Sequence, residues 1–81
     1  METKQIQSKI KEIIAEMFEV KPEDVSGDKP FKQMANYTSM RALEFLAKLE
    51  TEFNIIIDPD VLPQMTSVDA STKVVEGLVA A

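Results

Sequence analysis

The sequence contains no cysteine and no histidine, and these absences remove several kinds of chemistry. Without cysteine there is no disulfide framework, no thiolate metal site and no thiol nucleophile. Without histidine the chain lacks the usual general base for serine or cysteine hydrolysis and the commonest transition-metal ligand. An enzyme would have to work with carboxylates, lysines and one tyrosine. We do not expect one, and we predict no catalytic residue and no metal site.

Basic residues and long apolar runs are also scarce. Fourteen aspartates and glutamates stand against nine lysines and arginines, for a net charge of −5. Phosphates of nucleic acid or anionic membranes repel such a chain, whereas a basic protein surface attracts it. The longest aliphatic block, Ile55–Ile57, is too short for a membrane span, and the N-terminus lacks a signal-peptide core. We expect a cytoplasmic protein without nucleic-acid or membrane partners.

Apolar residues at three- and four-residue steps predict a first helix with one buried face, capped by Thr3. The expected buried residues are Ile6, Ile10, Ile13, Ile14, Met17 and Phe18. A long connection runs from about Val20 to Thr38, because two prolines and a glycine interrupt any helical pattern there. Val25 and Phe31 are expected to tie this connection to the core.

Three further helices complete the predicted fold. The second runs from about Ser39 to Phe53, and a short third helix begins at Asp58, before a proline, and ends near Leu62. A last helix is capped by Thr66 or Ser67 and buries one face, formed by Val68, Val75, Leu78 and Val79. The prediction is an all-α four-helix bundle: three main helices plus a short third helix, with a long loop between helices one and two.

Helical-wheel positions divide the second helix into three faces. The core face is expected to contain Ala42, Phe45, Leu46, Leu49 and Phe53. The solvated face is expected to contain Arg41, Glu44, Lys48, Thr51 and Glu52. Between them lie Met40, Leu43 and Ala47, with Glu50 beside them. This intermediate strip either widens the core or forms a partly exposed docking surface.

A serine, Ser39, opens the second helix directly after Thr38. Both residue types are favoured at helix starts, because their oxygens accept backbone N–H groups. Thr38 can provide this cap, which leaves the Ser39 hydroxyl available. A phosphate attached there would be favoured by the N–H donors and partial positive charge of the helix N-terminus. Since no base stands ready to activate the hydroxyl, Ser39 suits a serine that another enzyme modifies.

These features resemble the acyl carrier and peptidyl carrier proteins, which have an Asp-Ser-Leu motif at the start of the second helix of a four-helix bundle. Thr38-Ser39-Met40 occupies this position here. "VKPEDV" (20–25) resembles the start of the family's first loop, and "LEFLAKLETEFNIIID" (43–58) resembles the rest of the second helix and its exit. "TSVDAS" (66–71) resembles the entry to the last helix, so the likeness extends over nearly the whole chain.

The resemblance implies that Ser39 carries a 4′-phosphopantetheine arm, which a phosphopantetheinyl transferase moves from coenzyme A. Residues 1–81 would be a single, monomeric carrier domain that holds acyl intermediates as thioesters. It would shuttle them between enzymes of a fatty-acid or, in preference, a polyketide or other specialised pathway. Its partners would include an acyl- or aminoacyl-loading enzyme and a ketosynthase or other condensing enzyme. Partner recognition would involve Thr38, Met40, Leu43, Ala47 and Glu50.

Several positions depart from the family pattern. Thr38 replaces the aspartate that the transferase reads, so a capping oxygen is kept and a negative charge is lost. Asn36 replaces a glycine and tolerates the left-handed backbone expected there. Met40 is a more adaptable apolar group than leucine. Arg41 and Lys48 make the second helix less acidic than in fatty-acid carriers, which favours a specialised pathway.

Other functions remain open at this point. One alternative is an aminoacyl or peptidyl carrier of a non-ribosomal peptide pathway, and another is an unmodified pseudo-carrier that acts as a binding module. A small enzyme is disfavoured, because Asp58 and Asp60 around a proline suit helix capping better than metal binding. The initial methionine and a last helix reaching Ala81 suggest a free-standing protein.

Overall fold

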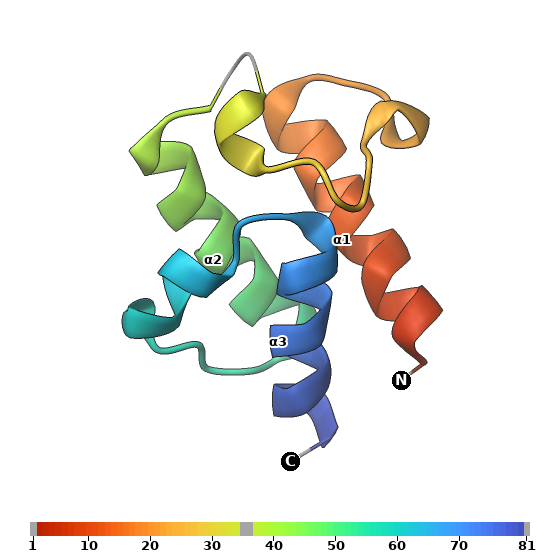
Figure 1. Ribbon diagram of the computed structural model, residues 1–81. Helices are drawn as coiled ribbons and strands as arrows, with labels where there is room; N and C mark the ends of the chain where they lie inside the picture. Colours follow the sequence, from red (N-terminus) through yellow and green to blue (C-terminus); the bar gives the residue numbers. More distant parts are fainter. Residues whose placement is uncertain (1, 35–36, 81) are drawn as a thin grey trace.

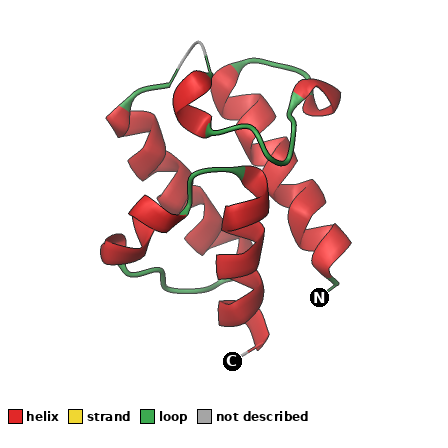
Figure 2. Ribbon diagram, viewed as in Figure 1, coloured by secondary structure: helices red, strands yellow, loops and turns green. Residues whose placement is uncertain are grey.

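The computed structural model describes residues 2–34 and 37–80, and all regular elements in these ranges are helical (Figure 2). The three α-helices are α1 (Thr3–Phe18), α2 (Ser39–Phe53) and α3 (Val68–Ala80) (Figure 1). The short 3-10 helices are η1 (Pro22–Asp24), η2 (Phe31–Gln33) and η3 (Pro59–Gln64). The prediction of an all-α fold with a short third helix is confirmed. None of the described helices is long and apolar enough to cross a membrane.

The start of α1 is capped differently from the prediction. Glu2 is the N-cap, and its side chain and that of Gln5 form a reciprocal capping box with the backbone. Thr3 is already helical and donates its hydroxyl to Glu76 of α3. The predicted Thr3 cap is therefore wrong, and this side chain instead joins the first turn of α1 to the later part of α3. The helix ends at Glu19 in the left-handed conformation, with φ 57°.

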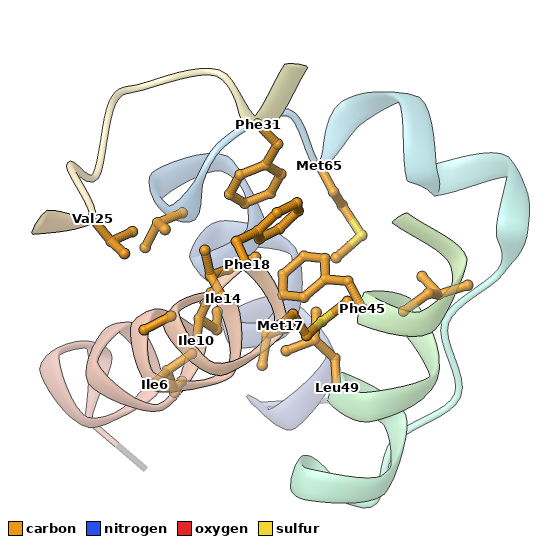
Figure 3. Packing of buried hydrophobic residues seen from close by; sticks show 14 of the residues in the cluster. Ile6, Ile10, Ile14, Met17, Phe18, Val25, Phe31, Phe45, Leu49 and Met65 are labelled. Carbon is orange, nitrogen blue, oxygen red and sulfur yellow. The ribbon is translucent and has the colours of Figure 1, made fainter. Parts of the chain in front are cut away.

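The core lies where the apolar face of α1 meets α2, α3 and the long connection (Figure 3). Ile6, Ile10 and Ile14 are fully buried, as the helical period predicts. Val25 and Phe31 are also buried, which confirms that they tie the connection to the core. The remaining buried apolar side chains are Ala15, Met17, Phe18, Phe45, Leu46, Leu49, Phe53, Ile57, Met65, Val68 and Val75.

Four apolar residues are less buried than the helical pattern predicts. Ala42 of α2 and Val79 of α3 are half-buried, which corrects their assignment to buried faces. Ile13 is half-buried at the edge of the core. Leu78 is 37% exposed, so the prediction that it belongs to the buried face of α3 is wrong. Ser71 and Thr72 are buried on that helix instead, and the Ser71 hydroxyl has no hydrogen-bond partner among the described residues. Small polar residues allow α3 to lie close to α1, its main contact partner.

Side-chain caps define where the last two helices, η3 and α3, begin. The Asp58 carboxylate accepts a hydrogen bond from the Asp60 N–H at 2.9 Å, which confirms its role as a cap. The element that follows is a 3-10 helix ending at Gln64, two residues beyond the prediction. The Ser67 hydroxyl accepts from the Ala70 N–H at 3.2 Å at the start of α3. Of the two predicted caps for this helix, Ser67 therefore makes the contact.

Asp69, in the first turn of α3, connects three segments. Its backbone N–H donates to the Gly27 carbonyl at 2.9 Å. Its carboxylate accepts from the Gln7 side chain of α1, also at 2.9 Å. A Cβ atom at Gly27 would stand 2.6 Å from that carboxylate, so glycine permits the close approach of the connection to α3. Asp69 thereby holds the first half of the connection against the bundle.

Candidate functional site at the start of α2

Ser39 is the first residue of α2, and its side chain is exposed. Thr38 before it has an extended backbone, and its Oγ1 accepts a hydrogen bond from the Arg41 N–H at 3.1 Å. The prediction that Thr38 caps α2 is confirmed. Within the described residues, the Ser39 hydroxyl has no hydrogen-bond partner. The turn predicted at Asn36 lies outside the described residues.

The start of α2 fits a phosphate-bearing group. Its first turn contains no acidic residue, so no carboxylate neutralises the partial positive charge of the helix N-terminus. Thr38 occupies only the Arg41 N–H, and the other first-turn N–H groups remain donors for an anion. No described side chain accepts a hydrogen bond from the Ser39 hydroxyl, so the described residues show no general base in contact with it.

An exposed apolar strip begins next to Ser39. Met40 is 71% exposed and Leu43 is 56% exposed, and Ala47 is also exposed. We call these three residues the α2 strip. The buried face of α2 is formed separately by Phe45, Leu46, Leu49 and Phe53. Of the two interpretations that the sequence left open, the strip is a surface feature and does not widen the core.

Two polar residues of α2 are more constrained than the sequence predicts. Glu50 is half-buried, and its carboxylate accepts a hydrogen bond from the Ile57 N–H at 2.8 Å, which fixes the exit of the helix. Arg41 was expected on the solvated face but is half-buried. Its guanidinium carbon lies 5.8 Å from the centre of the Phe18 ring. One N–H group of the same guanidinium donates a hydrogen bond to the Met17 carbonyl. Arg41 thus joins α2 to the end of α1.

A cavity of about 630 Å³ lies beside this helix start. Tyr37, Arg41 and Ala42 contribute to its lining from around the beginning of α2. Its volume falls within the range of about 300–1,000 Å³ that is usual for small-molecule sites. Sequence analysis did not identify the cavity, because its walls come from segments distant in the chain. The buried residues that line it are Ile14, Phe18, Phe31, Phe45 and Met65 (Figure 3).

Comparisons with known proteins agree with this geometry. Residues 8–73 match the family model described as "Phosphopantetheine attachment site". "Polyketide-8 synthase acyl carrier protein 1" from Streptomyces avermitilis is 33% identical over 66 residues, covering 82% of this chain and 79% of that protein. A chain in the solved structure "The ishigamide ketosynthase/chain length factor" has a TM-score of 0.73 and 33% identity, covering 93% of this chain and 94% of that chain.

A second solved structure, of an acyl carrier protein from Enterococcus faecalis, has a TM-score of 0.80 and covers 96% of this chain and 99% of that chain. At 23% identity it shows that the fold is shared. The family model extends over most of this chain, and the Streptomyces relative matches at 33% identity. The chain therefore belongs to the phosphopantetheine attachment site family, whose cofactor is 4′-phosphopantetheine.

Proposed function

We propose that this chain is an acyl carrier protein of a polyketide pathway and that Ser39 is its attachment site for 4′-phosphopantetheine. One observation carries the assignment: Ser39 lies inside the range that matches the family, exposed at the first residue of α2, while Thr38 supplies the cap. When bound, the arm supplies a thiol that holds acyl groups as thioesters. The polyketide synthase carrier from Streptomyces supports this pathway over fatty-acid synthesis.

The residues of this chain act as an acceptor and as a docking surface. In the attachment step, the Ser39 oxygen bonds to the phosphate of coenzyme A that bears pantetheine, and adenosine bisphosphate leaves. The transferase accepts the hydroxyl proton, because this chain has no histidine to do so. The N-terminus of α2 then stabilises the attached phosphate. Residues 1–81 serve as one non-catalytic, monomeric domain in the cytoplasm.

Successive enzymes would dock on the α2 strip. Its side chains are apolar and exposed next to Ser39, so a partner that buries them also approaches the arm. The net charge of −5 favours encounter with basic partner surfaces and contributes more to association rate than to affinity. The expected partners are the phosphopantetheinyl transferase, an acyl-loading enzyme and a ketosynthase, each released after its step.

Intact mass spectrometry tests the attachment. The protein is incubated with coenzyme A, magnesium and a broad-specificity phosphopantetheinyl transferase. We expect a single added phosphopantetheine in the wild type and in Ser8→Ala, which changes an exposed serine of α1. We expect no addition in Ser39→Ala. A wild type that stays unmodified with several transferases would contradict the proposal and favour a pseudo-carrier.

Loading assays on the modified protein test the pathway. Malonyl and other acyl donors are compared with amino acids supplied by adenylating enzymes. We expect acyl groups to be transferred to the arm and amino acids to remain unbound. Preferential loading of an amino acid would instead identify a carrier of a non-ribosomal peptide pathway.

A further inference from the structure

Methionine supplies all the sulfur of this chain, because the sequence has five methionines and no cysteine. The structure describes four of them, and they differ in exposure. Met17 and Met65 are buried among the core side chains (Figure 3), and Met34 is half-buried. Met40 is 71% exposed. Among the described residues, an oxidant in solution therefore reaches the Met40 thioether far more readily than the other three.

Met40 is also placed where a partner would dock. It is the second residue of α2, directly after Ser39, and it begins the α2 strip. It belongs neither to the core cluster nor to the half-buried apolar residues that pack against the core. The side chain of Met40 is therefore available to a partner, and a change in its chemistry leaves the packing of the bundle untouched.

Peroxide converts a thioether into a sulfoxide. A lone pair of the sulfur bonds to one oxygen of hydrogen peroxide, the O–O bond breaks, and water leaves. The thioether is oxidised as the peroxide is reduced. The product is polar, whereas the thioether is a flexible apolar group.

This change opposes docking on the α2 strip. The sulfoxide oxygen is a hydrated hydrogen-bond acceptor, and a partner that covers it has to remove its water. A partner surface suited to Met40 and Leu43 as apolar groups has no need of a donor at this point, so the oxygen stays unpaired in the complex. The bundle itself is preserved, because Met17 and Met65 are protected by burial.

We propose that Met40 is an oxidation site through which peroxide weakens the docking of partner enzymes next to Ser39. Methionine sulfoxide reductases reverse the step with a dithiol as reductant. The sulfoxide oxygen leaves as water, and the dithiol becomes a disulfide. The inference rests on the proposed function and adds to it a reversible modification that regulates the same site.

Peptide mapping tests where oxidation occurs. Unmodified protein is treated with hydrogen peroxide, catalase removes the excess, and sulfoxide is quantified at every methionine of the chain over time. We expect Met40 to be oxidised at least about tenfold faster than Met17 and Met65, while the far-UV circular dichroism spectrum stays unchanged. Equal rates at exposed Met40 and at the two buried residues would overturn the inference.

Transferase kinetics test the effect on docking. We expect kcat/KM for the oxidised wild type to fall roughly three- to tenfold, because a docking contact is lost. Treatment with both methionine sulfoxide reductases and dithiothreitol should restore the starting value.

Three variants assign the effect to Met40. Met40→Leu lacks the sulfur and is expected to keep, through peroxide treatment, whatever kcat/KM it has before treatment. Met34→Leu removes the half-buried methionine, retains Met40, and should lose activity on oxidation as the wild type does. Met40→Gln places a polar side chain of similar length in the strip and should give the low kcat/KM without peroxide.

The outcomes separate this inference from the proposed function. If the oxidised wild type is modified as fast as the reduced protein, or if Met40→Leu loses as much activity as the wild type, the inference is overturned while the carrier function stands. A reduced wild type that no transferase modifies would overturn the proposed function, and the effect on docking with it.

Discussion

Thr38 and Ser39 place two hydroxyls side by side at the start of α2, and the structure gives them different roles. The Thr38 oxygen accepts the Arg41 N–H, whereas the Ser39 side chain is exposed without a described partner. This division follows from backbone geometry, because Thr38 is extended and Ser39 is already helical. Only the residue before the first helical position can direct its oxygen to the free N–H groups.

The Thr38 cap makes a testable contribution to stability. Thr38→Ala removes the acceptor for the Arg41 N–H and should lower the free energy of unfolding by about 1 kcal/mol. Thr38→Asp keeps an acceptor and adds a negative charge at the helix N-terminus, so its stability should equal or exceed that of the wild type. Urea denaturation of the unmodified proteins measures both effects. If Thr38→Ala and Thr38→Asp lose the same amount of unfolding free energy, the hydrogen bond accepted by residue 38 does not explain the loss.

The sequence predicted some single residues well and others poorly. The Thr38 cap and the burial of Val25 and Phe31 followed from local rules about capping and isolated apolar residues. The contacts of Arg41 with the end of α1 and of Glu50 with Ile57 were missed. Both involve long side chains that reach another segment, and helical periodicity gives only the face on which such a side chain begins.

Helix α2 was predicted more accurately than the other elements. Its bounds, Ser39–Phe53, coincide with the prediction, because a strong cap precedes it and Asn54 ends it in the left-handed conformation. The α2 strip was recognised as a separate face, and the structure shows that it is exposed. Its role in partner recognition stays a prediction. The sequence signals were weaker at the other helices. Thr3 was predicted as the cap of α1 but Glu2 is the cap, and the helix after Asp58 was predicted to end near Leu62 but ends at Gln64.

Leu43 tests the role of the α2 strip. Leu43→Ala removes an exposed apolar group, so the free energy of unfolding should change by less than about 0.5 kcal/mol. We expect kcat/KM of the transferase to fall roughly three- to tenfold, because a docking contact is lost. Leu78→Ala, at a less exposed leucine of α3, is the control and should leave kcat/KM unchanged. Equal transferase kinetics for all three proteins would exclude Leu43 from docking.

Gly27 tests how the long connection is attached to α3. In Gly27→Ala the new methyl group would displace the Asp69 carboxylate and break its hydrogen bond to Gln7. We expect a loss of about 1 kcal/mol in the free energy of unfolding, the contribution of one such hydrogen bond. In an Asp69→Ala background the same substitution should cost much less, since the displaced carboxylate is absent. Additive losses in the double variant would contradict this explanation.

At the scale of the whole molecule, the bundle brings aromatic residues from four segments into one cavity. Sequence periodicity assigned Phe18 and Phe45 to buried faces, and Phe31 was expected to tie the connection to the core, but neither rule could place the three rings around a shared space. Cavities depend on how completely packed helices fill the volume between them, which local patterns do not encode. The fold was therefore predictable in outline, the role of Ser39 in attachment stays a prediction, and the cavity beside the start of α2 required the structure.

The central claim is that Ser39 carries the phosphopantetheine arm, and peptide mapping of the modified protein tests it most directly. Fragmentation that preserves the phosphoester can distinguish Ser39 from the neighbouring hydroxyl of Thr38. We predict that every fragment bearing the added group contains Ser39 and that fragments ending at Thr38 are unmodified. The group found on Thr38, or on a serine elsewhere in the chain, would contradict the assignment.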